Sequence, residues 1–235
     1  PVDLLCGSGI RQFTERGDGL DMEKELAKNY RFVRSIDRIN DAKGKVVCID
    51  ERMEAAAEEA NLPLLAEATR AAIDKLQERG DGGFFLMVEG GRIDHALHDT
   101  NAKRALQDSV AFDNAIAAAI TKMKTIDPEL KNTLIVVTAD HDHTLVLNGY
   151  AQRTGKTTDN QAGILGLVKN YSGATAGEAS VDADGMPYSI IGFGNGFNRV
   201  DGARNTVAAL TDESVSADDY RQEVVVEVGT PGSET

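Results

Sequence analysis

The chain has 235 residues, of which 41% are hydrophobic, so it is long enough to bury the core of one large domain or of a domain with an insertion. Its formal net charge of -13 and its lack of a Lys/Arg-rich block exclude a nucleic-acid backbone as the main partner, and no apolar run approaches the roughly 20 residues of a membrane helix. The acidic balance favours an ordinary solvated surface, with adaptation to high salt or affinity for cations as the alternatives.

Apolar runs and amphipathic segments alternate along the chain. The runs at 2–7, 45–50, 83–90, 132–140 and 188–196 predict short strands. The segments 64–77 and 101–122 carry apolar residues at helical spacing and predict amphipathic helices. This alternation favours an α/β fold with a largely parallel sheet. Residues 147–185 collect Gly, Thr, Ser, Asn and Asp without clear periodicity, so we expect a loop-rich insertion there.

The two cysteines, Cys6 and Cys48, lie inside the first two predicted strands. Neither belongs to a CxxC motif of the metal-binding type, so the sequence predicts buried thiols. Whether the two thiols pair with each other is left open. The N-terminal residues show no secretory signal pattern and therefore assign no compartment by themselves.

The first stretch that is dense in reactive side chains is VEGGRIDHALH, residues 88–98. Glu89 precedes a pair of glycines, and a helix is expected to start near Arg92. Asp94 and His98 are four residues apart, which places both on one helical face.

The second stretch is TADHDH, residues 138–143, which follows the apolar run TLIVV. Ligand sites in open parallel sheets lie at the carboxyl ends of strands, and all four histidines occur in two clusters at such ends. Mixed histidine and carboxylate ligands suit zinc, and an all-oxygen position beside them suits magnesium. Either cluster alone fits a surface ion pair or a capped turn about as well, but two clusters at equivalent strand ends favour a metal centre.

These motifs resemble those of the alkaline phosphatase family. FFLMVEGGRIDHALHDTNAKRALQDSVAFDNAI and NTLIVVTADHDHT carry the likeness, and VDLLCGSGIRQF and GYAQRTG with the residues after it are similar too. The resemblance implies a single domain over 1–235 with a three-layer αβα sandwich. It also implies hydrolysis of phosphate monoesters with two zinc ions and one magnesium ion, and binding of inorganic phosphate. It further implies a homodimer, with 147–185 as a candidate interface region, and a periplasmic or secreted location.

Carried over by position, the resemblance assigns a ligand role to five side chains. Glu89 corresponds to a carboxylate of the magnesium site. Asp94 and His98 correspond to two ligands of a first zinc ion. Asp140 and His141 correspond to two ligands of a second zinc ion.

The polar neighbours of these side chains receive lesser roles. His95 is expected either near the metals and phosphate or in a structural role. Asp142 and His143 are expected beside the ligands or on the surface. Arg92 is disfavoured as a phosphate ligand, because it begins the helix that carries the metal ligands.

Part of the family's apparatus has no convincing counterpart here. The nucleophilic serine, the bridging aspartate, the magnesium-site threonine and the phosphate-binding arginine are all missing, and Asp108-Ser109 is rejected as a nucleophile because it lies inside a predicted helix. Family members continue beyond GTPGSET with the histidine that completes the first zinc site. We therefore expect an internal piece of a longer protein, inactive alone and weak in metal binding.

Three functions compete at this point. The favoured one is an alkaline phosphatase that acts through a phosphoserine intermediate, with this chain supplying part of the metal site. The second is another metal-dependent hydrolase of the same superfamily, such as a phosphodiesterase or a sulfatase. The third is a non-enzymatic acidic domain that binds cations through surface carboxylates.

Overall fold

The computed structural model describes residues 2–55, 64–80, 82–148, 152, 155–196 and 200–222. The chain divides into two compact units, which are described separately. Unit 1 contains residues 1–91 and 107–137, and unit 2 contains residues 92–106 and 138–235. Within the described ranges, no helix combines the length and the apolar composition that a membrane crossing requires.

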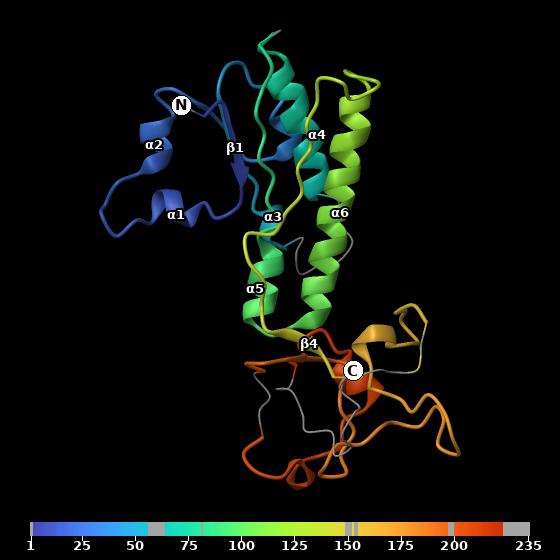
Figure 1. The fold of residues 1–235 in the computed structure, drawn as a ribbon. Coiled ribbons are helices and arrows are strands. Elements are labelled where there is room, and N and C mark those ends of the chain that lie inside the picture. Colours follow the sequence, from blue (N-terminus) through green and yellow to red (C-terminus); the bar gives the residue numbers. More distant parts are fainter. Residues whose placement is uncertain are drawn as a thin grey trace. The chain divides into compact units, whose positions relative to one another are not determined.

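Unit 1 contains a parallel sheet with the strand order β1-β3-β2. Its edge strand β1 is labelled in Figure 1. Its strands are β1 (Leu4–Gly7), β2 (Arg31–Val33) and β3 (Val46–Ile49). In register, Cys48 of β3 lies between Cys6 of β1 and Val33 of β2. β3 is buried along its whole length, as its uninterrupted apolar sequence indicates, because a central parallel strand is covered on both faces. The strands predicted at 2–7 and 45–50 are confirmed, whereas the short β2 was not predicted.

Two long helices follow from the apolar periodicity. α4 (Leu64–Gln77) has the predicted bounds, and α6 (Ala102–Lys124) begins one residue later and ends two residues later than predicted. α4 places Leu64 and Ala68 in a core with three other buried residues, which are Ile36, Ile39 and Cys48. α4 and α6 meet through small side chains, because Ala66 of α4 forms a buried cluster with Ala115 and Ala118 of α6. The remaining helical turns of unit 1 are short: α1 (Arg11–Thr14), α2 (Met22–Leu26), η1 (Ile36–Arg38) and α3 (Arg52–Ala55).

The two central apolar runs, 83–90 and 132–140, differ from the prediction. Neither forms a strand in the described part of the chain. Both runs are largely exposed instead: Phe85 is 88% and Met87 is 75% exposed, although Leu86 between them is half-buried. Leu134 and Val136 are likewise 88% and 72% exposed. The strand prediction was wrong here because an apolar run supplies a face to bury, but a strand also requires a hydrogen-bonded neighbour.

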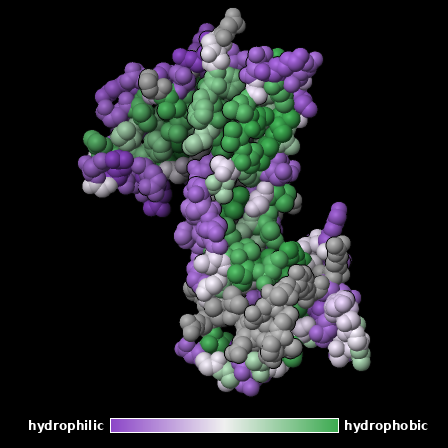
Figure 2. Space-filling model, viewed as in Figure 1, coloured by the Kyte–Doolittle hydropathy of each residue, from purple (hydrophilic) through white to green (hydrophobic). Residues whose placement is uncertain are grey.

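Figure 2 shows hydrophobic residues gathered on the visible face of unit 1. The exposed apolar side chains of 83–90 and 132–137 belong to this unit. Isolated exposed apolar residues are ordinary, but contiguous ones mark a surface that is suited to contact with another polypeptide.

Unit 2 is built on a two-stranded antiparallel sheet. β4 (Leu145–Leu147) pairs with β5 (Ile191–Phe193), so the run predicted at 188–196 does form a strand, but an antiparallel one. The core of this unit gathers around this sheet and is formed by Ala102, Leu165, Val168, Tyr188, Ile190, Ile191 and Phe193. The helical segments of unit 2 are α5 (Arg92–His98), η2 (Gly163–Leu165), η3 (Arg204–Thr206) and α7 (Asp212–Val215).

The start of α6 is held by a residue far along the chain. The side-chain oxygen of Gln222, which is 1% exposed, accepts a hydrogen bond of 2.8 Å from the backbone N–H of Ala102. The backbone N–H of Gln222 donates to the carbonyl of Thr100 at 2.8 Å. The first N–H groups of a helix have no partner within the helix, so the Gln222 side chain acts as a cap.

Between 155 and 185, regular structure is sparse. The described residues there form the η2 turn and isolated bridges such as Lys169 with Ala179. A loop-rich insertion at 147–185, and its place in a dimer interface, stay predictions. Residues 149–151, 153 and 154 of this segment lie outside the described residues.

Candidate metal centre

α5 presents Asp94 and His98 on one side of the helix. Ala96, two residues from each of them, lies on the opposite side of the helix and is fully buried, so the helix packs through that opposite side. The side chains of Asp94 and His98 remain 41% and 69% exposed, and His98 Nε2 lies 3.5 Å from Asp94 Oδ1. The helix predicted from about Arg92 is therefore confirmed, together with the shared face of these two residues.

A second segment of unit 2 supplies two more imidazoles. His141 and His143 lie just before β4, and the ladder with β5 is extended at this point by the Gly194 N–H, which donates to the Thr144 carbonyl at 2.8 Å. In extended backbone, residues two apart point to the same side. The rings of His141 and His143 accordingly lie with their centroids 5.3 Å apart.

Three imidazoles surround a single carboxylate oxygen. The Nε2 atoms of His143, His98 and His141 lie 2.9, 3.5 and 3.8 Å from Asp94 Oδ1. The ring of His143 also meets that of His98 edge to face, with centroids 4.9 Å apart. His143 is the most enclosed of these side chains, with 15% of its surface exposed.

This arrangement lowers the pKa of the Asp94 carboxyl below its usual value. The main cause is the hydrogen bond from His143, and the nearby His98 and His141 add to it. The ionised carboxylate is the form that binds a cation, so the lowered pKa keeps Asp94 in its cation-binding form.

The hydrogen bonding of His141 defines its tautomer. Its Nδ1 atom lies 3.0 Å from the backbone carbonyl oxygen of Asp142. A carbonyl only accepts, so Nδ1 carries the hydrogen, and in the neutral ring Nε2 keeps its lone pair. The pKa of His141 is raised, first by this carbonyl and then by the charge of Asp140.

The predicted ligands are distributed over both units. Asp94, His98, Asp140 and His141 belong to unit 2, where Asp140 Oδ2 lies 3.6 Å from His141 Nε2. Glu89 belongs to unit 1, where it is exposed at the end of the extended segment 83–90. The assignment of these five side chains as metal ligands stays a prediction.

His143 lies beside a predicted ligand, which is one of the two places that the sequence predicted for it. It makes the shortest of the three imidazole contacts to Asp94 Oδ1, at 2.9 Å. Its spacing of two residues from His141 in an extended segment was the available signal, because such residues share a side.

The sequence also drew attention to His95 and to Asp108-Ser109. Exposed His95 faces Arg92, with Nη1 and Nδ1 3.5 Å apart. Asp108 and Ser109 lie inside α6, in agreement with their rejection as a nucleophile.

The donor set fits a metal ion. Asp94, His141 and His143 each offer one ligand atom, and these atoms lie within 4.8 Å of one another. Two ligands of one tetrahedral zinc ion lie about 3.4 Å apart, since zinc binds nitrogen and oxygen at about 2.0–2.2 Å. Asp94 and His141 are close enough to ligate neighbouring ions, with His143 beside Asp94 as its hydrogen-bond partner. One carboxylate with two imidazoles matches the ligand preference of zinc.

The parallel sheet of unit 1 and the cluster of aspartate and histidine side chains define an α/β protein with a group of side chains that could hold a metal ion. A sequence model described as alkaline phosphatase matches residues 12–232. The chain therefore belongs to the alkaline phosphatase family, and the α/β fold expected from the resemblance is confirmed.

Curated relatives support this membership over part of the chain. A membrane-bound alkaline phosphatase of Bombyx mori is 39% identical over 139 residues, which cover 59% of this chain and 21% of the relative. The tissue-nonspecific alkaline phosphatase of Rattus norvegicus is 38% identical over 150 residues, which cover 63% of this chain and 24% of the relative. The matched part thus spans about a quarter of the length of these relatives.

Solved structures agree with the fold. A mutant of the TAB5 alkaline phosphatase with Mg bound in its M3 site is 27% identical, with a TM-score of 0.54 over 68% of this chain and 46% of that chain. A cold-active alkaline phosphatase from a psychrophilic Shewanella sp. is 25% identical, with a TM-score of 0.51 over 63% of this chain and 36% of that chain.

Proposed function

We propose that this chain supplies part of the metal-binding apparatus of an alkaline phosphatase, which hydrolyses phosphate monoesters through a phosphoserine intermediate. The observation that carries the proposal is the convergence of His98, His141 and His143 on Asp94 Oδ1. No serine of this chain is proposed as the nucleophile, because Asp108-Ser109 lies inside α6. The chain alone is accordingly expected to be inactive.

The proposed sites use the ligand types that each metal prefers. Asp94 and His98 hold one zinc ion, Asp140 and His141 hold a second, and Glu89 contributes a carboxylate to a magnesium ion. When bound, these ions stabilise the negative charge that develops on the attacking, leaving and equatorial oxygens during phosphoryl transfer.

The chain's own side chains prepare this centre. His143 donates to Asp94 Oδ1 at 2.9 Å and so holds the carboxylate in one orientation. The Asp142 carbonyl holds Nδ1 of His141 at 3.0 Å and leaves Nε2 turned toward Asp94. Hydrogen-bonding partners of this kind orient metal ligands and raise their affinity for the ion.

Family membership supports the remaining parts of the proposal. The substrate class is phosphate monoesters, with inorganic phosphate as the product that stays bound. We also propose a homodimer with 147–185 near its interface, and a periplasmic or secreted location. Size-exclusion chromatography with light scattering tests the dimer directly, since a monomeric mass at micromolar concentration contradicts it.

A metal titration tests the site in the chain itself. Zinc is titrated into the purified chain in competition with a chromogenic chelator, and the Asp94→Ala variant is compared with Asp142→Ala. Asp142→Ala removes the same charge two residues from Asp140 and is the matched control. We expect Asp94→Ala to lose zinc binding and Asp142→Ala to keep it. Equal affinities of both variants would instead support a non-enzymatic acidic domain that collects cations on its surface.

The reaction itself is tested in a chimera. This chain replaces the corresponding segment of the TAB5 enzyme, and the chimera is assayed on a chromogenic phosphate monoester, a phosphodiester and a sulfate ester. We expect hydrolysis of the monoester that is lost on chelation and in the Asp94→Ala chimera. Preference for the diester or the sulfate would favour another hydrolase of the superfamily.

A further inference from the structure

Cys6 and Cys48 lie opposite each other on neighbouring strands. They are register partners in the parallel pair of β1 and β3, although 42 positions separate them in the sequence. Neighbouring strands lie about 4.7–4.9 Å apart, and a disulfide bridges Cα atoms about 4.4–6.8 Å apart. Register partners in a sheet also point to the same face, so the backbone places both sulfur atoms on one side of the sheet.

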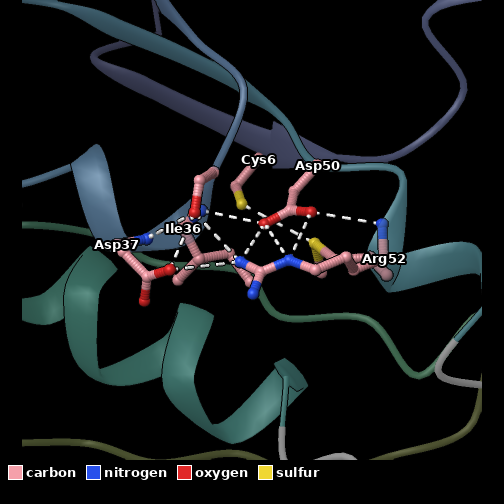
Figure 3. Close-up of polar contacts among 7 residues, drawn as sticks. Cys6, Ile36, Asp37, Asp50 and Arg52 are labelled. Atoms are coloured by element: carbon pink, nitrogen blue, oxygen red, sulfur yellow. Dashed lines mark hydrogen bonds and ion pairs between the residues drawn. The ribbon is translucent and has the colours of Figure 1, made fainter.

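The two thiols share an apolar environment. Cys48 is fully buried in a core with Ile36, Ile39, Leu64 and Ala68, and Cys6 packs against this core while it stays partly exposed. Both cysteines are free thiols. Figure 3 shows Cys6 near the buried Asp50, and the Cys6 Sγ atom lies 3.9 Å from the sulfur of Met53.

The thiols also differ in reactivity. The hydrogen bond from Cys48 lowers the pKa of Cys6, whereas the same contact and burial raise the pKa of Cys48. A thiolate is the attacking form of cysteine, so the partly exposed Cys6 is the thiol that meets a reagent first.

We propose that Cys6 and Cys48 are a modification site, a dithiol that closes to a reversible disulfide between β1 and β3. With a low-molecular-weight disulfide as the oxidant, the Cys6 thiolate attacks one of its sulfur atoms. The S–S bond of the oxidant breaks, one thiolate leaves, and a mixed disulfide remains on Cys6. Cys48 then gives its proton to solvent and attacks the Cys6 sulfur, which releases the second thiolate. The protein loses two electrons and two protons, and the oxidant is reduced to two thiols.

The spacing of the strands makes this disulfide reversible. Neighbouring strands lie about 4.7–4.9 Å apart, whereas a disulfide prefers Cβ atoms about 3.8 Å apart. Closure therefore draws β1 toward β3, and a bond formed under such strain is more easily reduced. The proposal is independent of the phosphatase function, because it concerns residues of unit 1 and uses no metal.

The experiment uses glutathione disulfide on the purified chain, followed by alkylation in denaturant and peptide mass spectrometry. We expect a peptide pair linked through Cys6 and Cys48, loss of both alkylated cysteines, and recovery of both on addition of dithiothreitol. The Cys48→Ser variant should instead accumulate glutathione on Cys6, because no second thiol resolves the adduct. The Cys6→Ser variant should leave Cys48 unmodified, because that thiol is buried.

Two controls keep the test decisive. Circular dichroism of both serine variants shows whether they keep the fold, and the same oxidation in urea shows whether the fold brings the thiols together. Faster linkage in the folded chain than in urea supports the proposal. A wild-type chain that only accumulates the glutathione adduct, or that links no faster when folded, overturns it.

Discussion

His143 Nε2 lies 2.9 Å from Asp94 Oδ1, although the two residues are 49 positions apart in the chain. The contact joins the helix that follows one apolar run to the segment that follows another. It makes the orientation of the Asp94 carboxylate depend on a residue that is not itself one of the five predicted ligands. This relationship leads to the first prediction.

His143→Ala is expected to weaken zinc binding by roughly 10–100-fold, which is the usual cost of losing a group that orients a metal ligand. His143→Gln keeps an N–H donor within reach of Asp94 and should retain part of the affinity. Competition with a chromogenic chelator measures both variants. His95→Ala is the matched control, because His95 is exposed on the same helix as Asp94 and faces Arg92. If His143→Ala and wild type bind zinc with equal affinity, His143 does not orient Asp94 for zinc binding.

The buried Asp50 should make the stability of unit 1 sensitive to acid. Figure 3 shows its carboxylate bound by the Arg52 guanidinium, with an Arg52 Nη2 to Asp50 Oδ2 distance of 2.6 Å, and by the Ile36 N–H at 3.0 Å. These bonds, that from Arg52 above all, lower the pKa of Asp50 from 3.8. A lowered folded-state pKa adds stability above the unfolded-state value, and this stability is lost as the pH falls through the folded-state pKa.

Asp50→Asn is therefore expected to cost about 1–3 kcal/mol of unfolding free energy at neutral pH, since buried donors lose their charged acceptor. The difference from wild type should shrink as the pH falls below 3.8, where the wild-type carboxyl also gains a proton. Urea titrations at several pH values give both numbers. Asp37→Asn is the control, because the side chain of Asp37 is 69% exposed and its contact with Arg52 is longer, at 3.3 Å. A constant difference at every pH would contradict this account of Asp50.

The exposed apolar side chains of unit 1 should tolerate replacement by lysine without loss of folding stability. Phe85→Lys and Leu134→Lys are expected to reduce binding of an apolar dye and self-association, because each side chain is 88% exposed. Their unfolding free energies should stay within about 0.5 kcal/mol of wild type, as for other surface substitutions. Leu86→Lys is the matched control, since Leu86 is half-buried on the same segment and its replacement should destabilise. A Phe85→Lys chain as unstable as Leu86→Lys would show that Phe85 packs in the core.

Gly163 and Gly173 can be compared to separate the cost of backbone conformation from the cost of a steric clash. Both adopt a positive φ, +57° and +83°. A Cβ at Gly163 would lie 2.7 Å from the backbone nitrogen of Thr157, whereas a Cβ at Gly173 would meet nothing within 4 Å. Gly173→Ala should cost about 1–2 kcal/mol for the backbone conformation alone. Gly163→Ala should cost more, because the Thr157 backbone must move, and thermal unfolding compares the two. Equal losses would mean that the turn at Gly163 relaxes without penalty.

Local pattern was sufficient for the helices. The spacing of apolar residues predicted 64–77 with the observed bounds, because one apolar stripe is buried against whatever lies beneath it. The four-residue spacing of Asp94 and His98 placed both on one face of α5, and His98 Nε2 lies 3.5 Å from Asp94 Oδ1. The ends of the apolar runs located both histidine clusters, since each cluster comes directly after such a run in the sequence.

The pairing of strands that are far apart in the chain could not be predicted from the sequence. The apolar runs at 83–90 and 132–140 predicted strands, but whether a neighbouring segment completes a ladder depends on residues elsewhere in the chain. For the same reason β5 was expected in a parallel sheet and pairs instead with β4, antiparallel. The sequence by itself determined the helices, the apolar faces and the family, because these depend on residues close together in the chain. Only the tertiary structure decided that His143 reaches Asp94 and that Cys6 lies beside Cys48, because contacts between distant residues depend on how the intervening chain folds.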